Sequence, residues 1–348
     1  MIHPIDAYIG LKRFFTSTIP PCRIWLQRPE DFHVIEIPKV YDVDENLYLL
    51  LKQNVDTFNA IEEIEKGLGG RWVWSGLKDS NAITVQHVSS KVDVGEWRWK
   101  RKNKCLYLKK IGKGGVKRGD LKANLFIIRL RSKCDIEGYV KETLDEMKDV
   151  PGIYSYQRFG TRRPITHVVG KMVLLGRWEE AINVLLGEPT PWESERAREV
   201  RRLYYEMGPK AYLDAPPYLN IERKVARALL KGLPPRKALL SLPQFEIFLG
   251  AFQAYIYNKA LTDLKWYNRT PGYDTYDLYK EYFKEEGIEK RSLKKFKVRS
   301  FRRSPKYNAK VVLRKSAEGL FLIFTLPKGY YATTLLREII KGDPKEFS

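Results

Sequence analysis

The segment from Ser75 to Ser90 holds the residues best suited to chemistry in this sequence. It reads SGLKDSNAITVQHVSS, so Gly76 allows an unusual turn and Lys78–Asp79 place a cation beside a carboxylate at the tip of that turn. One interpretation is a turn aspartate that caps its own neighbours. The other is a carboxylate nucleophile held in a shallow cleft. Spacing alone does not decide between the two.

Three basic segments are candidates for binding the phosphates of a nucleic acid. Residues 97–104 (WRWKRKNK) interleave aromatic and basic side chains, and residues 109–118 (KKIGKGGVKR) have the composition of a flexible basic loop. Residues 290–306 (KRSLKKFKVRSFRRSPK) contain nine basic residues and no acidic one. One charge run is usually a solvated face, but three of them favour phosphate contact. The residues expected to contact an RNA backbone are Arg98, Lys100, Arg101, Lys113, Lys294, Lys297, Arg302 and Arg303.

The composition agrees with a polyanionic partner. The 348 residues include 63 Lys and Arg against 42 Asp and Glu, which gives a formal net charge of +21. Aromatic residues make up 13%, and charge together with flat rings suits single-stranded nucleic acid. The alternative is a basic protein whose aromatic residues all belong to its core.

Cysteine and histidine usage argues against several classes of site. Cys22, Cys105 and Cys134 are far apart, odd in number and without a CxxC spacing, so they support neither a disulfide framework nor a zinc site. The four histidines form no HxxH or HExxH pair. We therefore expect no metal ion.

The ends and the apolar stretches argue against export and membrane insertion. Residues 1–20 lack the apolar core and cleavage site of a signal peptide. The longest uncharged apolar stretch, residues 247–258, is shorter than the ~18 residues that span a bilayer. We expect a soluble protein of the cytoplasm with no membrane partner.

The elements that must position these residues change in character along the chain. Residues 32–37 alternate as a half-buried strand does, residues 54–68 have helical spacing with Thr57 as the cap, and residues 125–130 form the clearest buried strand. Residues 177–231 are helical, and residues 243–264 form the longest helix, apolar on nearly every face and so normally buried between two layers. Strand patterns return at 311–313 and 320–326, before a helix over 333–341. This order suggests one domain interrupted by another.

The run GLKDSNAITVQ resembles the signature of the TruD-type pseudouridine synthases, roughly G-x-K-D-x-x-A-x-T-x-Q, whose aspartate is the nucleophile. Five further segments resemble that family in family order, so the sequence is identified as a member of its archaeal/eukaryotic-like branch. These segments are PEDF at 29–32 with Glu36–Ile37, LKANLF at 121–126 with Leu130–Arg131, QRFG at 157–160 with RPITH at 163–167 and Gly170, FQAYIYN at 252–258, and LPKGYYAT at 326–333 with Leu336–Glu338.

Three positions depart from the family pattern. Gly152 stands where the family has an asparagine that contacts the target nucleotide, which puts that contact in doubt. Leu26 replaces a lysine, for which Arg28 lies close enough to substitute, and Ala123 replaces a glycine.

The resemblance implies an α+β fold. A catalytic domain of the pseudouridine synthase type, with a mixed and largely antiparallel sheet, would comprise residues 1–160 and 296–348. An inserted, mostly helical TRUD domain would occupy residues 161–295, and the RNA would lie between the two. Residue patterns do not settle which domain the helix at 243–264 packs against.

The resemblance also implies the chemistry, a cofactor-free isomerisation of uridine to pseudouridine in RNA. Asp79 would be the nucleophile, attacking either the ribose or the base, on a nucleotide flipped out of its stack. Phe32, Tyr154 and Tyr331 would hold that base, although each could instead be core. Further substrate-binding candidates are Arg158, Lys78 and Arg28, although Arg158 and Lys78 could equally form structural salt bridges.

The family acts mainly on tRNA, typically at uridine 13, and the sequence does not choose between this target and other RNAs. We expect a monomer. The alternative function is a non-catalytic RNA-binding or chaperone protein on the same scaffold. A metal-dependent nuclease is a remote third, because the clustered acids it needs are missing from the sequence.

Overall fold

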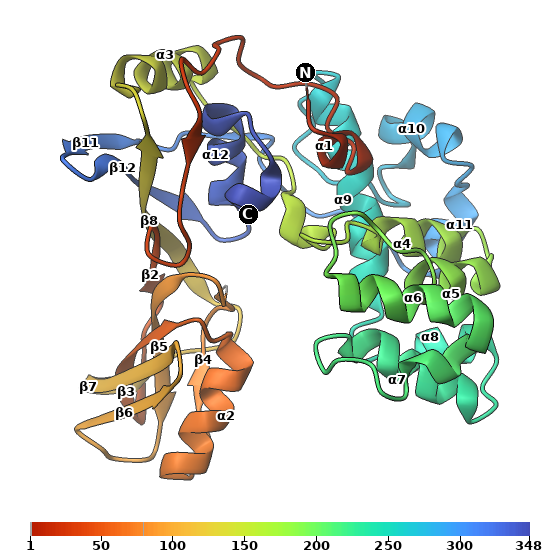
Figure 1. Cartoon of the computed structure of the whole chain (residues 1–348), viewed down its shortest axis with the longest axis horizontal. Helices are drawn as coiled ribbons and strands as arrows, with labels where there is room; N and C mark the ends of the chain where they lie inside the picture. Colours follow the sequence, from red (N-terminus) through yellow and green to blue (C-terminus); the bar gives the residue numbers. More distant parts are fainter. Residues whose placement is uncertain (1, 79) are drawn as a thin grey trace.

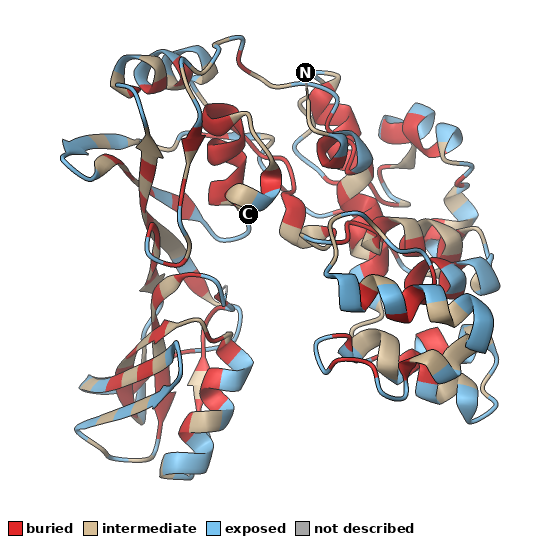
Figure 2. Cartoon of the chain, in the orientation of Figure 1, coloured by how far each residue is buried: buried red, intermediate tan, exposed pale blue. Residues whose placement is uncertain are grey.

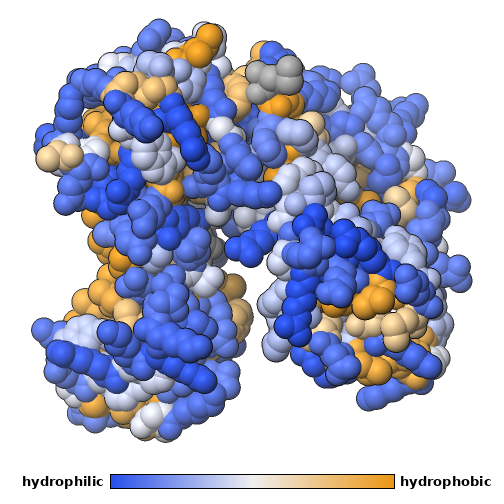
Figure 3. All heavy atoms as spheres, in the orientation of Figure 1, coloured by the Kyte–Doolittle hydropathy of each residue, from blue (hydrophilic) through white to orange (hydrophobic). Residues whose placement is uncertain are grey.

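The molecule consists of a sheet-bearing part and a helical part, which lie side by side in space (Figure 1). The computed structural model describes residues 2–78 and 80–348. In the space-filling view an open groove separates the lower end of the sheet from the helical part (Figure 3).

The sheet is mixed and largely antiparallel, as expected. In the described residues it has ten strands, with the order β11-β12-β8-β2-β5-β3-β7-β6, while β1 pairs with β8 and β4 with β5. Neighbouring strands run antiparallel apart from β2 and β5, which run parallel. The strands are β1 Ile24–Trp25, β2 Phe32–Pro38, β3 Tyr41–Gln53, β4 Val73–Trp74, β5 Ile83–Ser90, β6 Glu96–Arg101, β7 Lys104–Gly115, β8 Leu121–Ser132, β11 Val312–Ser316 and β12 Gly319–Pro327. A separate pair joins β9 (Val150–Pro151) to β10 (Lys306–Tyr307).

Two hydrophobic cores support this sheet. At its lower end α2 (Thr57–Leu68) packs on the strands through a cluster that includes Ile61, Ile64 and Trp72. The cap of α2 is Asp56, whose side chain accepts a hydrogen bond from the Asn59 amide, rather than the expected Thr57. At the upper end the core includes residues of α3 (Glu137–Met147) and α12 (Ala332–Ile340) and continues into the helical part.

The helical part contains the helices from α4 to α11, all of which lie between residues 161 and 295. They are α4 Thr166–Leu174, α5 Trp178–Leu186, α6 Glu195–Met207, α7 Asn220–Leu230, α8 Pro235–Leu240, α9 Glu246–Thr262, α10 Lys280–Glu285 and α11 Lys290–Lys295. As expected for a helix that is apolar on nearly every face, α9 is buried along most of its length (Figure 2). None of the described helices is long and apolar enough to cross a membrane.

The helix α9 packs against both parts of the molecule, which answers the question left open by the sequence. It lies along α4, while its Asn258 side chain accepts from the amide of Tyr154 and donates to the carbonyl of Tyr154 at 2.8 and 2.9 Å. The same side chain donates to the carbonyl of Ile9, which follows the N-terminal helix α1 (Pro4–Tyr8). Asn258 therefore fixes the backbone of an expected site residue to the helical part.

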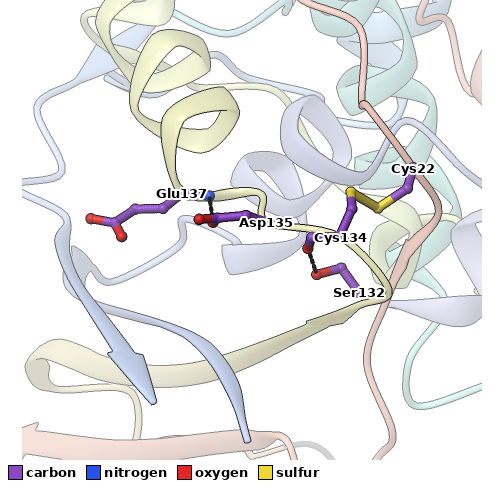
Figure 4. Close-up of a disulfide and its surroundings, with 5 residues drawn as sticks. All are labelled: Cys22, Ser132, Cys134, Asp135 and Glu137. Atoms are coloured by element: carbon purple, nitrogen blue, oxygen red, sulfur yellow. Dashed lines mark hydrogen bonds between the residues drawn. A yellow bond between two sulfur atoms is a disulfide. The ribbon is translucent and has the colours of Figure 1, made fainter. Parts of the chain in front are cut away.

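Cys22 and Cys134 form a disulfide, which corrects the expectation that these cysteines would not pair (Figure 4). The cause is the register of β1 on β8, in which Ile24 lies opposite Ser132. Cys22 lies two residues before Ile24, and Cys134 lies two residues after Ser132. The same antiparallel pairing therefore places the two cysteines opposite each other. The two cysteines are 112 residues apart in sequence, so spacing along the chain does not reveal the pair.

The basic segment at 109–118 is also not the flexible loop that its composition suggests. Most of it belongs to β7, which pairs with β3 on one side and β6 on the other. Lys110 forms an ion pair with Asp93. Gly112 and Gly114 of this segment have φ values of 156° and 125°. Glycine adopts such positive values without the steric cost that a Cβ would cause.

Candidate active site

A cavity of about 270 Å³ lies beside the residues that precede Asp79 in the chain. Asp79 itself is outside the described residues, but Gly76, Leu77 and Lys78 line this cavity. The rest of its wall comes from β2, β8, the turn at Gln157 and the segment before α12. That wall includes Phe32, Asn124, Phe126, Gln157, Lys328, Tyr330 and Tyr331.

Hydrogen bonds from α2 and β3 hold the loop before Asp79 in place. The amide of Lys78 donates to Thr57 Oγ1 at 3.0 Å. The buried ammonium of Lys52 donates to the carbonyls of Val55 and Lys78. Gly76 leaves room for the side chains of Lys78 and Glu36, since a Cβ on it would lie 2.7 Å from Lys78 Nζ and 3.1 Å from Glu36 Oε2. The loop is thus fixed up to the residue before Asp79.

Lys78 forms a buried ion pair with Glu36 of β2, with 2.6 Å between Nζ and Oε2. Glu36 also accepts hydrogen bonds from Ser75 Oγ and from the amide of His87. Burial lowers the pKa of His87, against the attraction of Glu36. The sequence left two interpretations of Lys78 open, a structural salt bridge and a substrate-binding residue. Its charge is neutralised by the salt bridge to Glu36, and it also lines the cavity.

Of the three rings expected to hold a base, Phe32 and Tyr331 line the cavity and Tyr154 lies behind Tyr331. The ring centroids of Tyr154 and Tyr331 are 6.4 Å apart. Tyr154 is 6% exposed, and burial raises the pKa of its hydroxyl to about 12. Phe126 supplies a further ring, 6.1 Å from Phe32.

Phe32 is positioned by the acidic residue before it. Asp31 is buried and accepts hydrogen bonds from Arg129 and Arg131 of β8 at 2.5 Å each, and from the amide of Gln27. Burial alone would raise the pKa of Asp31, but the hydrogen bonds from Arg131, Gln27 and Arg129 lower it. This arrangement explains why the PEDF and L-R segments accompany one another.

The two other arginine candidates lie in different places. The guanidinium carbon of Arg28 lies 3.9 Å from the centroid of the Phe32 ring, next to the cavity wall. Arg158 donates to the carbonyl of Gly250 in α9 at 3.4 Å and is absent from the cavity lining among the described residues.

Seven of the eight expected phosphate contacts are exposed, and Arg303 is the exception. Arg98, Lys100, Arg101 and Lys113 lie on the β6–β7 hairpin, whereas Lys294, Lys297 and Arg302 lie on or after α11.

Arg303 is 8% exposed, and its guanidinium stacks 4.1 Å from the Tyr154 ring and 4.6 Å from the Tyr330 ring. It also donates to the carbonyls of Gly152, Ile153 and Gly329. Arg303 therefore supports the rings of the site and is not placed to bind an RNA backbone.

The glycine at 152 has a steric reason. A Cβ there would lie 2.4 Å from the carbonyl oxygen of Ser304, and the Gly152 amide donates to the carbonyl of Pro305 at 2.7 Å. The asparagine expected at this position has no room.

Sequence reasoning missed Asn124, Phe126, Gln157, Lys328 and Tyr330 as residues of the site. All five lie in the quoted segments LKANLF, QRFG and LPKGYYAT. The motifs therefore carried the signal, but only the fold shows which of their residues face the cavity. The described residues contain no group of three or more His, Cys, Asp or Glu that could hold a metal ion.

Comparisons with known proteins agree with this geometry. Residues 9–266 match the family model of tRNA pseudouridine synthase D (TruD). Two archaeal relatives named "Probable tRNA pseudouridine synthase D" are each 32% identical to the chain. The one from Sulfurisphaera tokodaii aligns over 98% of this chain and 100% of its own length, and the one from Saccharolobus solfataricus over 99% of both.

A solved structure from Methanosarcina mazei, described as the "Putative tRNA pseudouridine synthase D (TruD)", has the same fold. It superposes with a TM-score of 0.74 at 25% sequence identity and covers 99% of this chain and 100% of its own.

Proposed function

We propose, since the chain belongs to the TruD family of tRNA pseudouridine synthases, that it acts on uridine 13 of tRNA with Asp79 as the nucleophile. The target nucleotide would be flipped out of its stack into the cavity described above. Unstacking costs about a few kcal/mol, and contact with the Phe32 and Tyr331 rings would recover part of it. We also expect the protein to act as a monomer in the cytoplasm.

The proposed reaction rearranges bonds within one nucleotide. The Asp79 carboxylate attacks the ribose or the base, and the bond between N1 of uracil and C1′ of the ribose breaks. The freed uracil turns over, C5 forms a carbon–carbon bond to the same C1′, and the bond between Asp79 and the nucleotide breaks to release the carboxylate. The proton lost from C5 is balanced by one gained at N1, so the product is an isomer and no oxidant or reductant is consumed.

One observation carries this proposal: the three residues before Asp79 line a cavity that also presents aromatic rings and amide side chains. The rings suit the faces of a uracil, and the amides of Asn124 and Gln157 offer donors and acceptors for its edges. The buried Glu36–Lys78 pair neutralises two of the charges next to this cavity. The exposed basic residues would supply affinity for phosphates but little choice of sequence.

The test is Asp79→Asn. An unmodified tRNA transcript is incubated with the purified variant, and pseudouridine is then located by chemical mapping. We expect pseudouridine at position 13 to disappear, a fall of at least about 1,000-fold in rate, because the amide has lost the nucleophilic oxygen. Affinity for the transcript should change little.

Asp145→Asn is the matched control, because Asp145 is an exposed aspartate of α3 and does not line the cavity. It should retain full activity. Undiminished modification by Asp79→Asn would refute Asp79 as the nucleophile, whereas absence of modification by the unmutated protein would favour the non-catalytic RNA-binding protein. That alternative also requires that neutralising the basic residues of 290–306 removes all function.

A further inference from the structure

A second cavity, of about 380 Å³, lies in the helical part. It is larger than the cavity lined by Gly76, Leu77 and Lys78. The first turns or caps of α4, α6, α7 and α9 surround it, contributing Thr166, Ser194, Ile221 and Ile247. In the space-filling view, apolar side chains gather over α6 and α7 and are bordered by hydrophilic ones (Figure 3).

The RPITH segment, which the catalytic cavity does not use, builds the floor of this second cavity. Buried Arg163 donates to the carbonyls of Val184, Leu185 and Glu188 at the end of α5. Arg201 of α6 is paired with Glu193 and Glu222 at 2.7 and 2.9 Å. These charged groups are satisfied by the protein itself and form a rigid, charge-balanced base.

The entrance carries a different set of groups. Tyr218 is 61% exposed, and its hydroxyl lies 3.0 Å from Ser194 Oγ. Ile247, which is 39% exposed, belongs to the same lining. The lining contains three arginines and two glutamates. Since Arg163 and Arg201 lie with the glutamates, exposed Arg162 gives the lining one excess positive charge. An aromatic face, an aliphatic wall, hydroxyls and one surplus cation together match an unpaired nucleotide.

The chain places this cavity close to the catalytic one. Gln157 lines the first cavity, and Arg162 lines the second cavity. Arg162 is five positions after Gln157, so their Cα atoms are at most about 18 Å apart. One RNA strand a few nucleotides long can therefore reach both cavities.

We infer that the second cavity receives another unstacked nucleotide of the same RNA, with its base against Tyr218 and Ile247 and its phosphate near Arg162. This inference rests on the proposed function, because it takes RNA as the substrate. It assigns to the helical part a role in choosing which uridine is presented to Asp79. Phosphate contacts alone do not provide such a choice.

The experiment measures binding, so it does not depend on catalysis. The Asp79→Asn protein is titrated with tRNA transcripts that each lack one base, at successive positions on either side of uridine 13. We expect loss of one particular base to weaken binding about 10- to 100-fold, the effect of one stacked base. Tyr218→Ala should weaken binding of the intact transcript by a similar factor and should lose no more when that base is removed.

Tyr205→Ala is the matched control, since Tyr205 is 63% exposed on α6 and is not part of the lining. It should behave like the parent on every transcript. The inference is overturned if no single base matters, or if the losses from Tyr218→Ala and from the missing base simply multiply. Absence of pseudouridine formation by the unmutated enzyme would refute the proposed function and leave this binding result standing on its own.

Discussion

Single residues in this site are constrained mainly by what lies behind them. Arg303 is an example: it belongs to a strongly basic run, yet its guanidinium is enclosed between Tyr154 and Tyr330 and saturated by backbone carbonyls. Those carbonyls include that of Gly152, which in turn packs on Ser304. The absence of the family's asparagine at 152 is therefore coupled to the local backbone around Arg303.

Gly152→Asn should destabilise the protein rather than restore a contact with the nucleotide. The new Cβ would overlap the Ser304 carbonyl, and overpacking of this kind costs about 1–3 kcal/mol. We expect a lower midpoint of thermal denaturation, measured by circular dichroism. Gly95→Asn is the control, since a Cβ on Gly95 meets nothing within 4 Å. Equal midpoints for the two variants would contradict the steric explanation.

The same example shows what the sequence predicts at this scale. Phe32, Lys78 and Tyr331, which the motifs single out, line one cavity, and their binding of a base stays a prediction. Tyr154 lies behind Tyr331, and Arg303, expected from its charge to contact an RNA backbone, is buried. Whether a basic side chain is exposed depends on distant segments that fold over it, and a local pattern contains no information about those.

Helices and strands, like single residues, depend both on their local sequence pattern and on contacts with distant segments. Residues 195–207 have a clear amphipathic pattern, and α6 spans these residues. The basic glycine-rich run after residue 108 has no apolar alternation, yet it forms the second half of β7 because β3 supplies backbone partners along it, while β6 pairs only up to Lys109. Local chemistry predicts elements that are stable by their own pattern, and pairing with remote strands determines the others.

The Cys22–Cys134 disulfide connects the β1 segment to the end of β8, so its removal should destabilise the protein. A cross-link closing about 110 residues is worth about 2–5 kcal/mol, mainly through the entropy of the unfolded chain. We expect Cys22→Ser and Cys134→Ser to lower the denaturation midpoint equally, and the double variant to lower it no further. The free cysteine Cys105 provides the control, because Cys105→Ser should respond to reductant as the parent does. Additive effects of the two single variants would argue against a shared bond.

The helix α4 makes the fold sensitive to acid through His167. This ring stacks on Tyr255 with centroids 4.8 Å apart and contacts Phe159, and burial lowers its pKa to about 3. The unfolded chain, with a pKa near 6.5, binds the proton more readily. The stabilising contribution is therefore complete above about pH 6.5 and is lost as the pH falls towards 3.

At pH 5 this difference amounts to about 2 kcal/mol relative to pH 7. Urea denaturation at the two pH values should show that loss in the parent and a smaller one in His167→Phe, which keeps an aromatic ring in the stack. Parallel pH profiles for the two proteins would show that another group controls the acid sensitivity.

At the scale of the whole molecule, the exposed basic residues form two separate sets. One lies on the β6–β7 hairpin of the sheet-bearing part and the other on and after α11 of the helical part, at opposite outer edges in the view of Figure 1. A large polyanion such as tRNA can contact both at once, whereas a short oligonucleotide reaches one. This arrangement predicts that affinity for tRNA depends strongly on salt.

The prediction is quantitative for the second set. Replacing Lys294, Lys297 and Arg302 with Gln removes up to three phosphate contacts, so the slope of log affinity against log salt concentration should become shallower by about 2–3. Affinity at low salt should fall, while the rate at saturating tRNA should change little because the cavity is untouched. The slope is measured by fluorescence anisotropy with labelled tRNA at about 50 to 300 mM salt. This range spans the roughly 50–200 mM over which such contacts are lost.

The control for net charge replaces Lys66, Lys141 and Lys265 with Gln. These lysines are paired with Glu62, Glu137 and Glu281, so the same three charges are removed from places already neutralised locally. If the second set makes true phosphate contacts, this control keeps the parental slope, since a slope counts displaced counterions and not total charge. A control that flattens the slope as much as the test variant would mean that only the overall field of +21 attracts the RNA.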